Sequence, residues 1–267
     1  MPRTFRAKSA KSALTAAATA ATALLALTAC STSPTSSPSG KGDAPQQVTV
    51  LAAASLTDVF GEAKKAYEKK HPDTRLTFSF AGSQELAAQV RQGVPADALV
   101  TADTRTMDDL AARTGKPTTI AKNRLTIATA PGNPKGIHGL ADLSRSDLKV
   151  VLAAPQVPAG RYSKKVLDEQ HVTVAPVSQE PSVRAVLSKV TLGEADAGLV
   201  YVTDATAKQN KQKVTTVTIP DAQNAVASYP AATLKNAKHP EQAKEFVAWL
   251  GTDEAQAILR KAGFQQP

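Results

Sequence analysis

Two serines stand where the sequence passes from a strand-like run into a helix-like run. Ser55 follows the apolar run 48–54, and Ser83 follows the alternating run 75–80. Taken singly, each serine reads most simply as a helix N-cap. The same position also favours an anion, because the first amides of a helix lack intrahelical partners and the helix dipole is positive there. Two such turns in one α/β lobe could share one oxyanion outside the carboxyl ends of the strands.

The second half of the chain offers matching features. The run VPAGRY at 157–162 is a tight turn before a helical pattern, and it is equally a plain connection. The run PSVR at 181–184 begins another helix, with a proline suited to the first turn and backbone amides free behind it. Tyr201 ends an apolar strand. Its ring fits a core and its hydroxyl fits a cleft equally well, so the residues alone leave both readings open.

The sequence lacks the motifs of the common catalytic sites. It contains no GK[ST] phosphate loop, no GxSxG elbow and no HExxH. Four isolated histidines stand in polar, loop-like segments: His71, His138, His171 and His239. A tethered hydrolase with Ser55 or Ser83 as nucleophile is the alternative of a different class, but no histidine has the setting of its general base. We therefore expect a binding protein and not an enzyme.

Strands and helices alternate along the chain, which predicts an α/β fold. The expected strands are 48–54, 75–80, 98–101, 125–130, 148–153, 197–201, 214–219 and 228–233; the expected helices are 55–70, 84–92, 106–113, 139–143, 163–170, 182–192, 240–250 and one through Leu259. We expect two lobes, each a mainly parallel sheet flanked by helices. Lobe 1 would comprise residues 47–125 with 230–267, and lobe 2 residues 126–229, so that the C-terminal helices return to the first lobe.

The N-terminal residues have the parts of a secretory signal. Residues 1–29 hold four basic residues and no acidic one, and an Ala-rich apolar stretch ends in LTAC at 27–30. The stretch is shorter than the ~20 strongly apolar residues of a membrane span, and threonines dilute it. The run LTAC resembles the lipobox of bacterial lipoproteins. We expect removal of residues 1–29, a lipid on Cys30, and attachment to the outer face of the cell membrane.

The composition of the chain excludes several kinds of site and partner. Cys30 is the only cysteine among 267 residues, which excludes an intramolecular disulfide and a thiolate metal cluster. Residues 31–46, rich in Ser, Pro and Gly, predict a flexible tether of roughly 20–25 Å. The net charge of +9 falls to about +5 without the signal, and aromatic residues are 4% of the chain. The scattered basic residues lack the aromatic-lined stripe of a nucleic-acid site, so we expect no nucleic-acid partner.

Five runs of the mature chain carry a resemblance to a known family. They read VTVLAAASLTDVF, FAGSQELAAQVRQGVPADALVTAD, VPAGRYSKKVL, PSVRAVL and GLVYVTDA. In this order they resemble the extracytoplasmic molybdate-binding proteins of ABC transporters, over nearly all of 48–264. The runs AASL, PAD and VPAGxY are specific together, although each is weak alone. Many members carry an acidic residue shortly before VPAG, where this chain has AAPQ at 153–156; that departure concerns the shape of the loop.

The resemblance implies a two-lobed periplasmic-binding-protein fold of type II, with the ligand in the cleft between the lobes. It implies that molybdate, and tungstate with it, is held by two serine side chains with neighbouring amides, by backbone amides of two helix starts, and by a tyrosine hydroxyl. The matching positions are Ser55, Ser83, Ala159, Val183 and Tyr201. Molybdenum would be bound only as the oxyanion, and no other cofactor is implied.

This ligand set contains only hydroxyl and amide donors, which suits a fully ionised dianion. An added proton would meet no acceptor, so hydrogen phosphate is disfavoured, whereas only size would exclude sulfate, the alternative ligand. Because both lobes supply ligands, binding should close them and present the loaded carrier to an ABC permease in the membrane. We expect a monomer. Arg161 and Arg184 flank the site, and we expect them to act as steering charges or surface contacts.

Overall fold

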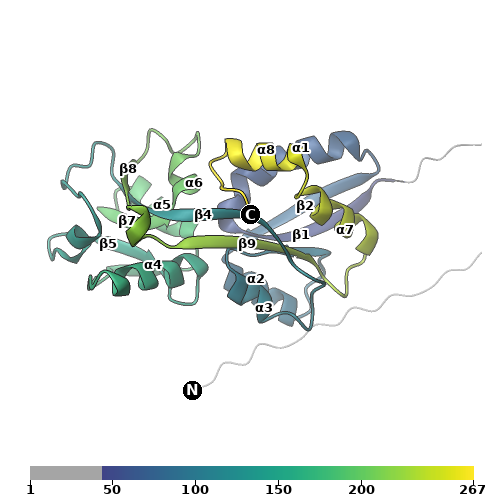
Figure 1. Cartoon of the computed structure of the whole chain (residues 1–267), viewed down its shortest axis with the longest axis horizontal. Coiled ribbons are helices and arrows are strands. Elements are labelled where there is room, and N and C mark those ends of the chain that lie inside the picture. The colour runs from purple at the N-terminus through teal and green to yellow at the C-terminus, as the bar shows by residue number, and fades with distance from the viewer. Residues whose placement is uncertain (1–43) are drawn as a thin grey trace, which may run out of the picture. The chain divides into compact units, whose positions relative to one another are not determined.

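The computed structural model describes residues 44–267, whose fold is drawn in Figure 1. The expected signal 1–29, Cys30 and most of the tether lie outside the described residues. The first strand begins at Gln46, two residues before the expected start, so the tether ends sooner than residue 46. Every helix within residues 44–267 is too short or too polar to cross a membrane.

Lobe 1 is built on a sheet in which parallel strands lie at one side and antiparallel strands at the other. In sheet order the strands are β2 (Thr74–Ala81), β1 (Gln46–Ala53), β3 (Ala98–Val100), β9 (Val226–Thr233) and β4 (Thr118–Thr129). Strand β1 pairs in parallel with β2 and β3, whereas β9 pairs antiparallel with β3 and β4. The expected parallel sheet is therefore found only in the part that strand–helix units build.

Helices cover both faces of this sheet, as Figure 1 shows. They are η1 (Ala54–Leu56), α1 (Thr57–Lys70), α2 (Ser83–Arg91), α3 (Thr104–Asp108), α7 (Pro240–Trp249) and α8 (Asp253–Lys261). Alternate residues of a strand point to opposite faces. Accordingly, Val50 belongs to the large core under α1 and α7, while its neighbour Leu51 belongs to the smaller core under α2 and α3. As expected, both C-terminal helices return to lobe 1, α7 against β9 and α8 against α1.

Lobe 2 repeats the plan on a smaller scale. Its sheet continues from β4 through β7 (Ala197–Tyr201), β5 (Val150–Ala153) and β6 (Ser178–Glu180), and β8 (Thr215–Thr218) pairs with β4. Its helices are η2 (Leu140–Ser144), α4 (Pro158–Glu169), α5 (Val183–Thr191), α6 (Val202–Thr206) and η3 (Asp221–Gln223). Strand β5 is parallel to β6 and β7, whereas β4 is antiparallel to β7 and β8.

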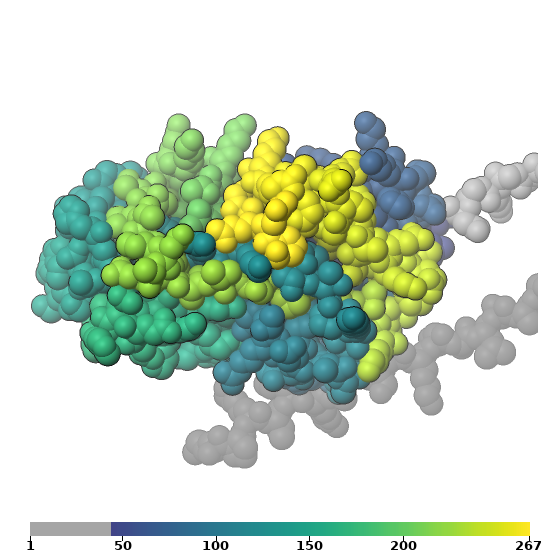
Figure 2. Space-filling model, in the orientation of Figure 1, coloured from purple at the N-terminus to yellow at the C-terminus, as the bar shows by residue number. Residues whose placement is uncertain are grey.

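Two long strands, β4 and β9, join the lobes. Residues 118–124 of β4 pair with β9, and residues 125–129 pair with β7 and β8. The expected lobe boundaries fall inside these continuous strands, so their positions stay a prediction. The C-terminal residues also reach the crossover: Gln265 bridges to Lys122, and Phe264 packs edge-on against Tyr229. In the space-filling view of Figure 2 the C-terminal segment lies between surfaces that come from both lobes.

The observed ends of helices and strands differ most from the expected ones where a proline starts a helix or where a distant strand extends a strand by pairing with it. Helix α4 begins at Pro158 and not at 163, because proline suits the first helical position. Strand β4 begins at Thr118 and not at 125, because β9 supplies its partner there. Helix α3 ends at Asp108, and turns replace the expected helix to 113. The short elements β6 and α6 carry no periodicity long enough to predict them.

Candidate functional site

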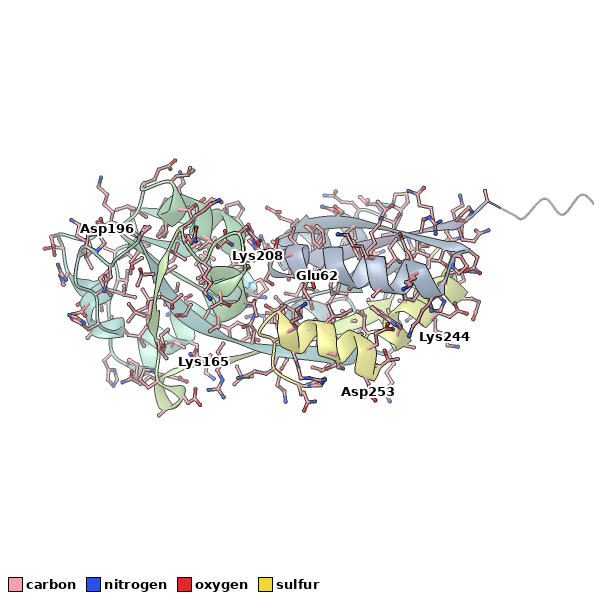
Figure 3. The ribbon with its side chains drawn as sticks, turned by 90° about the horizontal axis from the view of Figure 1, so that it is seen from above. Glu62, Lys165, Asp196, Lys208, Lys244 and Asp253 are labelled. Carbon is pink, nitrogen blue, oxygen red and sulfur yellow. The ribbon has the colours of Figure 1, made fainter. Side chains whose placement is uncertain are left out.

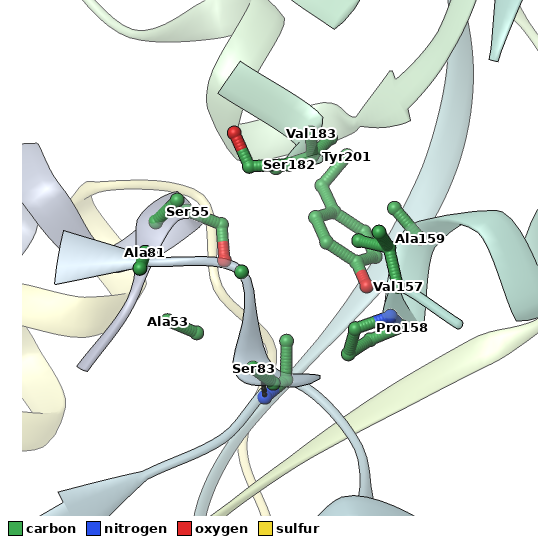
Figure 4. A pocket seen from close by; sticks show the side chains of 13 residues that line it. Ala53, Ser55, Ala81, Ser83, Val157, Pro158, Ala159, Ser182, Val183 and Tyr201 are labelled. Atoms are coloured by element: carbon green, nitrogen blue, oxygen red, sulfur yellow. Dashed lines mark hydrogen bonds between the residues drawn. The ribbon is translucent and has the colours of Figure 1, made fainter. Parts of the chain in front are cut away.

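A small cavity lies between the lobes, at the carboxyl ends of strands from both of them. Its empty space, counted together with the adjoining open solvent, is about 210 Å³, which is below the range of pockets for drug-sized ligands. The lining residues are Ala53, Ala54, Ser55, Ala81, Gly82, Ser83, Ala102, Val157, Pro158, Ala159, Ser182, Val183 and Tyr201. All five predicted site residues are therefore among the thirteen that line one cavity. Figure 4 shows Ser55 and Ser83 on one side of it, with Tyr201 and Ala159 across from them.

Four helix starts meet at this cavity. The segment η1–α1 follows β1, α2 follows β2, α4 follows β5 and α5 follows β6, and the first residues of each line the cavity. The first amides of a helix have no intrahelical partner, and the dipoles add positive potential at each start. Two starts come from each lobe. The cavity is thus surrounded by amide donors and carries a positive potential without holding a cation.

Ser83 does not cap a helix. Its hydroxyl is buried and accepts a hydrogen bond from the Ala102 amide at 3.0 Å, while Gly82 occupies the N-cap position of α2. Because the Ser83 oxygen already accepts one bond, its O–H remains to donate into the cavity. The capping interpretation is wrong at this position, since Ser83 is the first residue of α2 and Gly82 is the N-cap, with no side-chain cap hydrogen bond.

Ser55 is likewise engaged by something other than a helix amide. Its Oγ lies 3.0 Å from the Tyr229 hydroxyl, which in turn lies 3.4 Å from the donating Asn123 Nδ2. Asn123 also donates to Thr203 Oγ1 at 2.8 Å. Because Tyr229 already accepts from Asn123, its own O–H is available to donate to Ser55, and in that arrangement the Ser55 O–H points to the cavity. No sequence pattern marked Tyr229 or Asn123, because they reach Ser55 from the crossover strands.

Tyr201 serves both roles that its sequence position allowed. The residue is 1% exposed, and its ring packs edge-on against Tyr229 at a centroid distance of 5.9 Å. Its hydroxyl is buried and has no hydrogen-bond partner among residues 44–267. Burial, and then the neighbouring Tyr229, raise the pKa of Tyr201 well above its usual 10. The group therefore remains a neutral O–H donor whose partner the described chain does not supply.

Lobe 2 contributes backbone donors. Pro158 is the first residue of α4 and has no N–H, so Ala159 carries the first amide of that helix. Gly160 follows it, and a side chain there would run into the carbonyl oxygens of Ala153 and Ala154. In α5 the Ser182 hydroxyl accepts from the Ala185 amide at 3.2 Å, which leaves the Val183 amide at the helix start. With these residues in place, the first residues of α4 and α5 line the cavity.

The described residues that line the cavity include no charged side chain and no histidine. Residues 44–267 also hold no group of three His, Cys, Asp or Glu side chains that could bind a metal ion. The polar side chains of the lining end in hydroxyls, which can donate, and the first amides of the helix starts lie beside them. A compact, fully deprotonated oxyanion is the ligand whose lone pairs match such a set, because buried lone pairs need donors.

Two arginines, which we expected to act as steering charges or surface contacts, lie just outside the lining, and both are engaged in ion pairs. Arg161 makes an ion pair with Asp103, and Arg184 makes ion pairs with Asp58 and Asp204. The Asp204 side chain is fully buried, and burial raises its pKa to about 6, against the opposing effect of Arg184. Arg184 Nε lies 2.7 Å from Asp204 Oδ1, although their alignment is that of an ionic contact and not of a hydrogen bond.

Comparisons with known proteins agree with this geometry. Residues 48–265 match the family model of the bacterial extracellular solute-binding proteins. Over 235 residues the chain is 41% identical to the molybdate-binding protein ModA of Mycobacterium tuberculosis, with 87% of this chain and 89% of that protein covered.

Two solved structures share the fold. The periplasmic molybdate-binding protein of Azotobacter vinelandii superposes with a TM-score of 0.69 at 20% identity, covering 82% of this chain and 99% of that one. The sulfate-binding protein SubI of M. tuberculosis superposes with a TM-score of 0.70 at 21% identity, covering 83% and 87%. At these identities the likeness concerns the fold, and it confirms the predicted two-lobed binding-protein architecture.

Proposed function

The chain belongs to the bacterial extracellular solute-binding proteins, and from that premise we propose that it binds molybdate outside the cell and delivers it to an ABC importer. One observation carries the proposal: a cavity between the lobes is lined by hydroxyls and by the first residues of four helix starts, with no charged side chain among the described lining residues. The 41% identity to a mycobacterial molybdate-binding protein supports the choice of anion. Tungstate, which has the same shape and charge, is bound by the same groups.

We assign the anion contacts to Ser55, Ser83, Ala159, Val183 and Tyr201. The first two and Tyr201 donate from hydroxyls, and Ala159 and Val183 donate from backbone amides. Hydrogen bonds to a charged group contribute about 1.5–3 kcal/mol each, so five or more offset the desolvation of a buried dianion. The unpartnered Tyr201 hydroxyl supports this assignment most directly, because a buried hydroxyl without a partner costs free energy unless a ligand accepts from it.

Sulfate is the second candidate. Its charge and shape satisfy the same donors, and the fold is shared with a sulfate-binding protein. The two anions differ in size, so the dimensions of the cavity in the bound state decide between them. Hydrogen phosphate is disfavoured, because its proton needs a strong acceptor and the described lining residues include no carboxylate and no histidine.

A hydrolase is the weaker reading of the same serines. A nucleophilic serine needs a base within hydrogen-bond reach. Ser55 lies against Tyr229, Ser83 accepts from a backbone amide, and no histidine is among the described lining residues. We infer a carrier with no catalytic step.

The proposed carrier works outside the cytoplasmic membrane. Residues 1–29 direct export, and the lipid on Cys30 holds the protein at the outer face of the cell membrane. Residues 31–45 form a tether between the lipid and the folded lobes. The partner is the membrane permease of the importer, which receives the anion from a monomeric carrier. This part of the proposal depends on the sequence of the N-terminal segment and on the family.

Calorimetry of the chain against molybdate, tungstate, sulfate and phosphate tests the proposal. We expect saturable 1:1 binding of molybdate and tungstate, weaker binding of sulfate, and none of phosphate. At about 1,000 times the dissociation constant, ligand raises the free energy of unfolding by roughly 4 kcal/mol, which a thermal shift detects. If sulfate at equal concentration raises the melting temperature as much as molybdate does, the choice of molybdate is wrong.

A further inference from the structure

Arg161 links the two lobes beside the cavity. It belongs to α4 of lobe 2, and its guanidinium meets the Asp103 carboxylate of lobe 1, with Nε donating to Oδ2 at 2.9 Å. Its Nη2 also donates to Thr106 Oγ1 at 2.8 Å. The Asp103 side chain is 5% exposed and that of Arg161 is 22% exposed. The pair is therefore largely shielded from water, where an ion pair is screened less than on an open surface.

Arg184 forms a second link on another side of the cavity. It belongs to α5 of lobe 2, and its Nη2 donates to Asp58 Oδ2 in α1 of lobe 1. Within its own lobe the same guanidinium contacts the buried Asp204. Asp58 and Arg184 both line a larger groove between the lobes, in which Glu62 and Lys208 also lie (Figure 3). This second pair is the more accessible of the two.

Both links lie next to the proposed anion donors in the chain. Arg161 is two residues beyond Ala159, and Arg184 directly follows Val183. Asp58 lies three residues beyond Ser55 in lobe 1. On both sides of the cavity, the helix start that donates to the anion therefore also carries an arginine of an ion pair between the lobes. Neither arginine lines the cavity itself.

The partners are held in place within their own lobes. Asp103 is the N-cap of α3 and accepts from the Thr106 amide at 3.2 Å. Arg161 also donates to the Gln156 carbonyl, and Arg184 is held by Asp204. Groups oriented beforehand lose less conformational entropy when they meet, so more of the pairing energy favours the joined lobes.

We propose that Arg161 and Arg184 are positioning residues that hold the lobes closed, and that their pairs with Asp103 and Asp58 set the affinity and release rate of the anion without touching it. The inference rests on the proposed function. A pair formed only when the lobes meet biases the open–closed equilibrium, and apparent affinity scales with the fraction of closed molecules. Lobe couplings of this kind typically change affinity 5- to 150-fold.

Neutralising the aspartates separates this role from simple charge attraction. Asp58→Asn and Asp103→Asn each remove a negative charge near a site for a dianion, so electrostatic attraction alone predicts tighter binding. The closure role predicts weaker binding, by about 5- to 150-fold per variant, through faster dissociation. Asparagine keeps the N-cap at 103, because Asn and Asp cap equally well.

The experiment measures molybdate affinity and dissociation rate for the full chain purified in detergent. Asp147→Asn is the matched control, since it breaks an arginine–aspartate pair within lobe 2, where Arg145 Nη2 lies 2.9 Å from Asp147. The melting temperature without ligand establishes that each variant is folded. A distance between fluorophores on the two lobes reports the closed fraction directly, and the aspartate variants should lower it.

The outcomes separate the two proposals. If the unaltered chain binds no molybdate, the proposed function is wrong. If it binds molybdate and both aspartate variants bind equally or more tightly, the closure role is wrong and the proposed function stands. Molybdate and tungstate affinities should fall by the same factor, because the pairs act on the lobes; a changed ratio between the two anions would also contradict the closure role.

Discussion

At the scale of single residues, the Tyr201 hydroxyl is the most informative group. It is buried, remains protonated and lacks a partner among residues 44–267. Tyr201→Phe should weaken molybdate binding about 10- to 100-fold, because one hydrogen bond to a charged acceptor is lost. The free energy of unfolding without ligand should stay the same or rise, since the variant no longer buries an unpartnered hydroxyl. Calorimetry and urea unfolding measure the two quantities.

Tyr67→Phe is the matched control. Tyr67 is also fully buried, and its hydroxyl also lacks a partner within the described chain, but it lies among Phe246 and Trp249 and not at the cavity. Removal of that hydroxyl should leave the affinity for molybdate unchanged. Equal losses of affinity in both variants would mean that Tyr201 acts through packing and not through a bond to the anion.

The raised pKa of Asp204 makes the free energy of unfolding depend on pH. Its pKa is raised from 3.8 to about 6 in the folded chain, so the folded state binds a proton more tightly than the unfolded state does. The resulting stabilisation is complete below about pH 4 and is lost as the pH rises through 6. The difference amounts to roughly 3 kcal/mol.

Urea unfolding at a series of pH values measures this dependence. The free energy of unfolding of the unaltered chain, minus that of Asp204→Asn, should fall by up to roughly 3 kcal/mol between pH 4 and pH 7. Other titrating groups are common to both chains and cancel in the difference. A difference that is constant or rises over this range would show that Asp204 is not buried as described.

The residue scale also shows what sequence could predict. Ser55, Ser83 and Tyr201 follow strands, and that position alone brings them to one edge of a sheet. The bonds that set their donor directions come from distant parts of the chain, such as Tyr229, which lies 174 positions beyond Ser55. No local spacing marks such a partner, and the same holds for the carboxylates that meet Arg161 and Arg184.

At the scale of elements, a close approach between lobes depends on a glycine. Gly82 precedes α2 in lobe 1, and a Cβ there would overlap the Pro181 carbonyl oxygen of lobe 2. The neighbouring Gln84 donates to the same oxygen at 2.9 Å. Gly82→Ala should therefore prevent full closure and weaken molybdate binding by at least tenfold, because the donors of the two lobes no longer reach one anion.

Binding measurements on Gly82→Ala need a control for the general effect of replacing glycine. Gly61→Ala in α1 serves, because a Cβ there meets nothing within 4 Å. That variant should keep its affinity and gain up to about 1 kcal/mol of helix stability. If Gly82→Ala binds molybdate as tightly as Gly61→Ala does, the lobes do not need this contact to close.

Elements built from neighbouring residues were predictable, and those built across the chain were not. Strand–helix units such as β1–α1 and β2–α2 follow from hydrophobic periodicity and appear close to their expected positions. The full length of β4 does not follow from periodicity, because its first half is a strand only through its pairing with β9. The antiparallel pairs of the crossover have the same origin, which is why the sheet is more mixed than the sequence suggested.

At the scale of the whole molecule, the proposed lipid on Cys30 should determine where the protein is held and should have no effect on anion binding. Cys30→Ser should release the protein from the membrane fraction or leave it unprocessed, because no acyl chain can be attached. Anion affinity should not change, since the cavity is formed entirely within residues 53–201. Fractionation of cells, followed by calorimetry on the purified variant, measures both. Retention of Cys30→Ser at the membrane in processed form would contradict lipid anchoring.

The central claim is that one oxyanion binds where the four helix starts meet. Crystals grown with tungstate test it directly, since anomalous scattering from tungsten locates the anion independently of any model. We expect a single strong peak within hydrogen-bond distance of Ser55 Oγ, Ser83 Oγ and the Tyr201 hydroxyl, and of the Ala159 and Val183 amides. A peak beside Arg184 and Lys208 in the larger groove, with none in the cavity, would contradict the account.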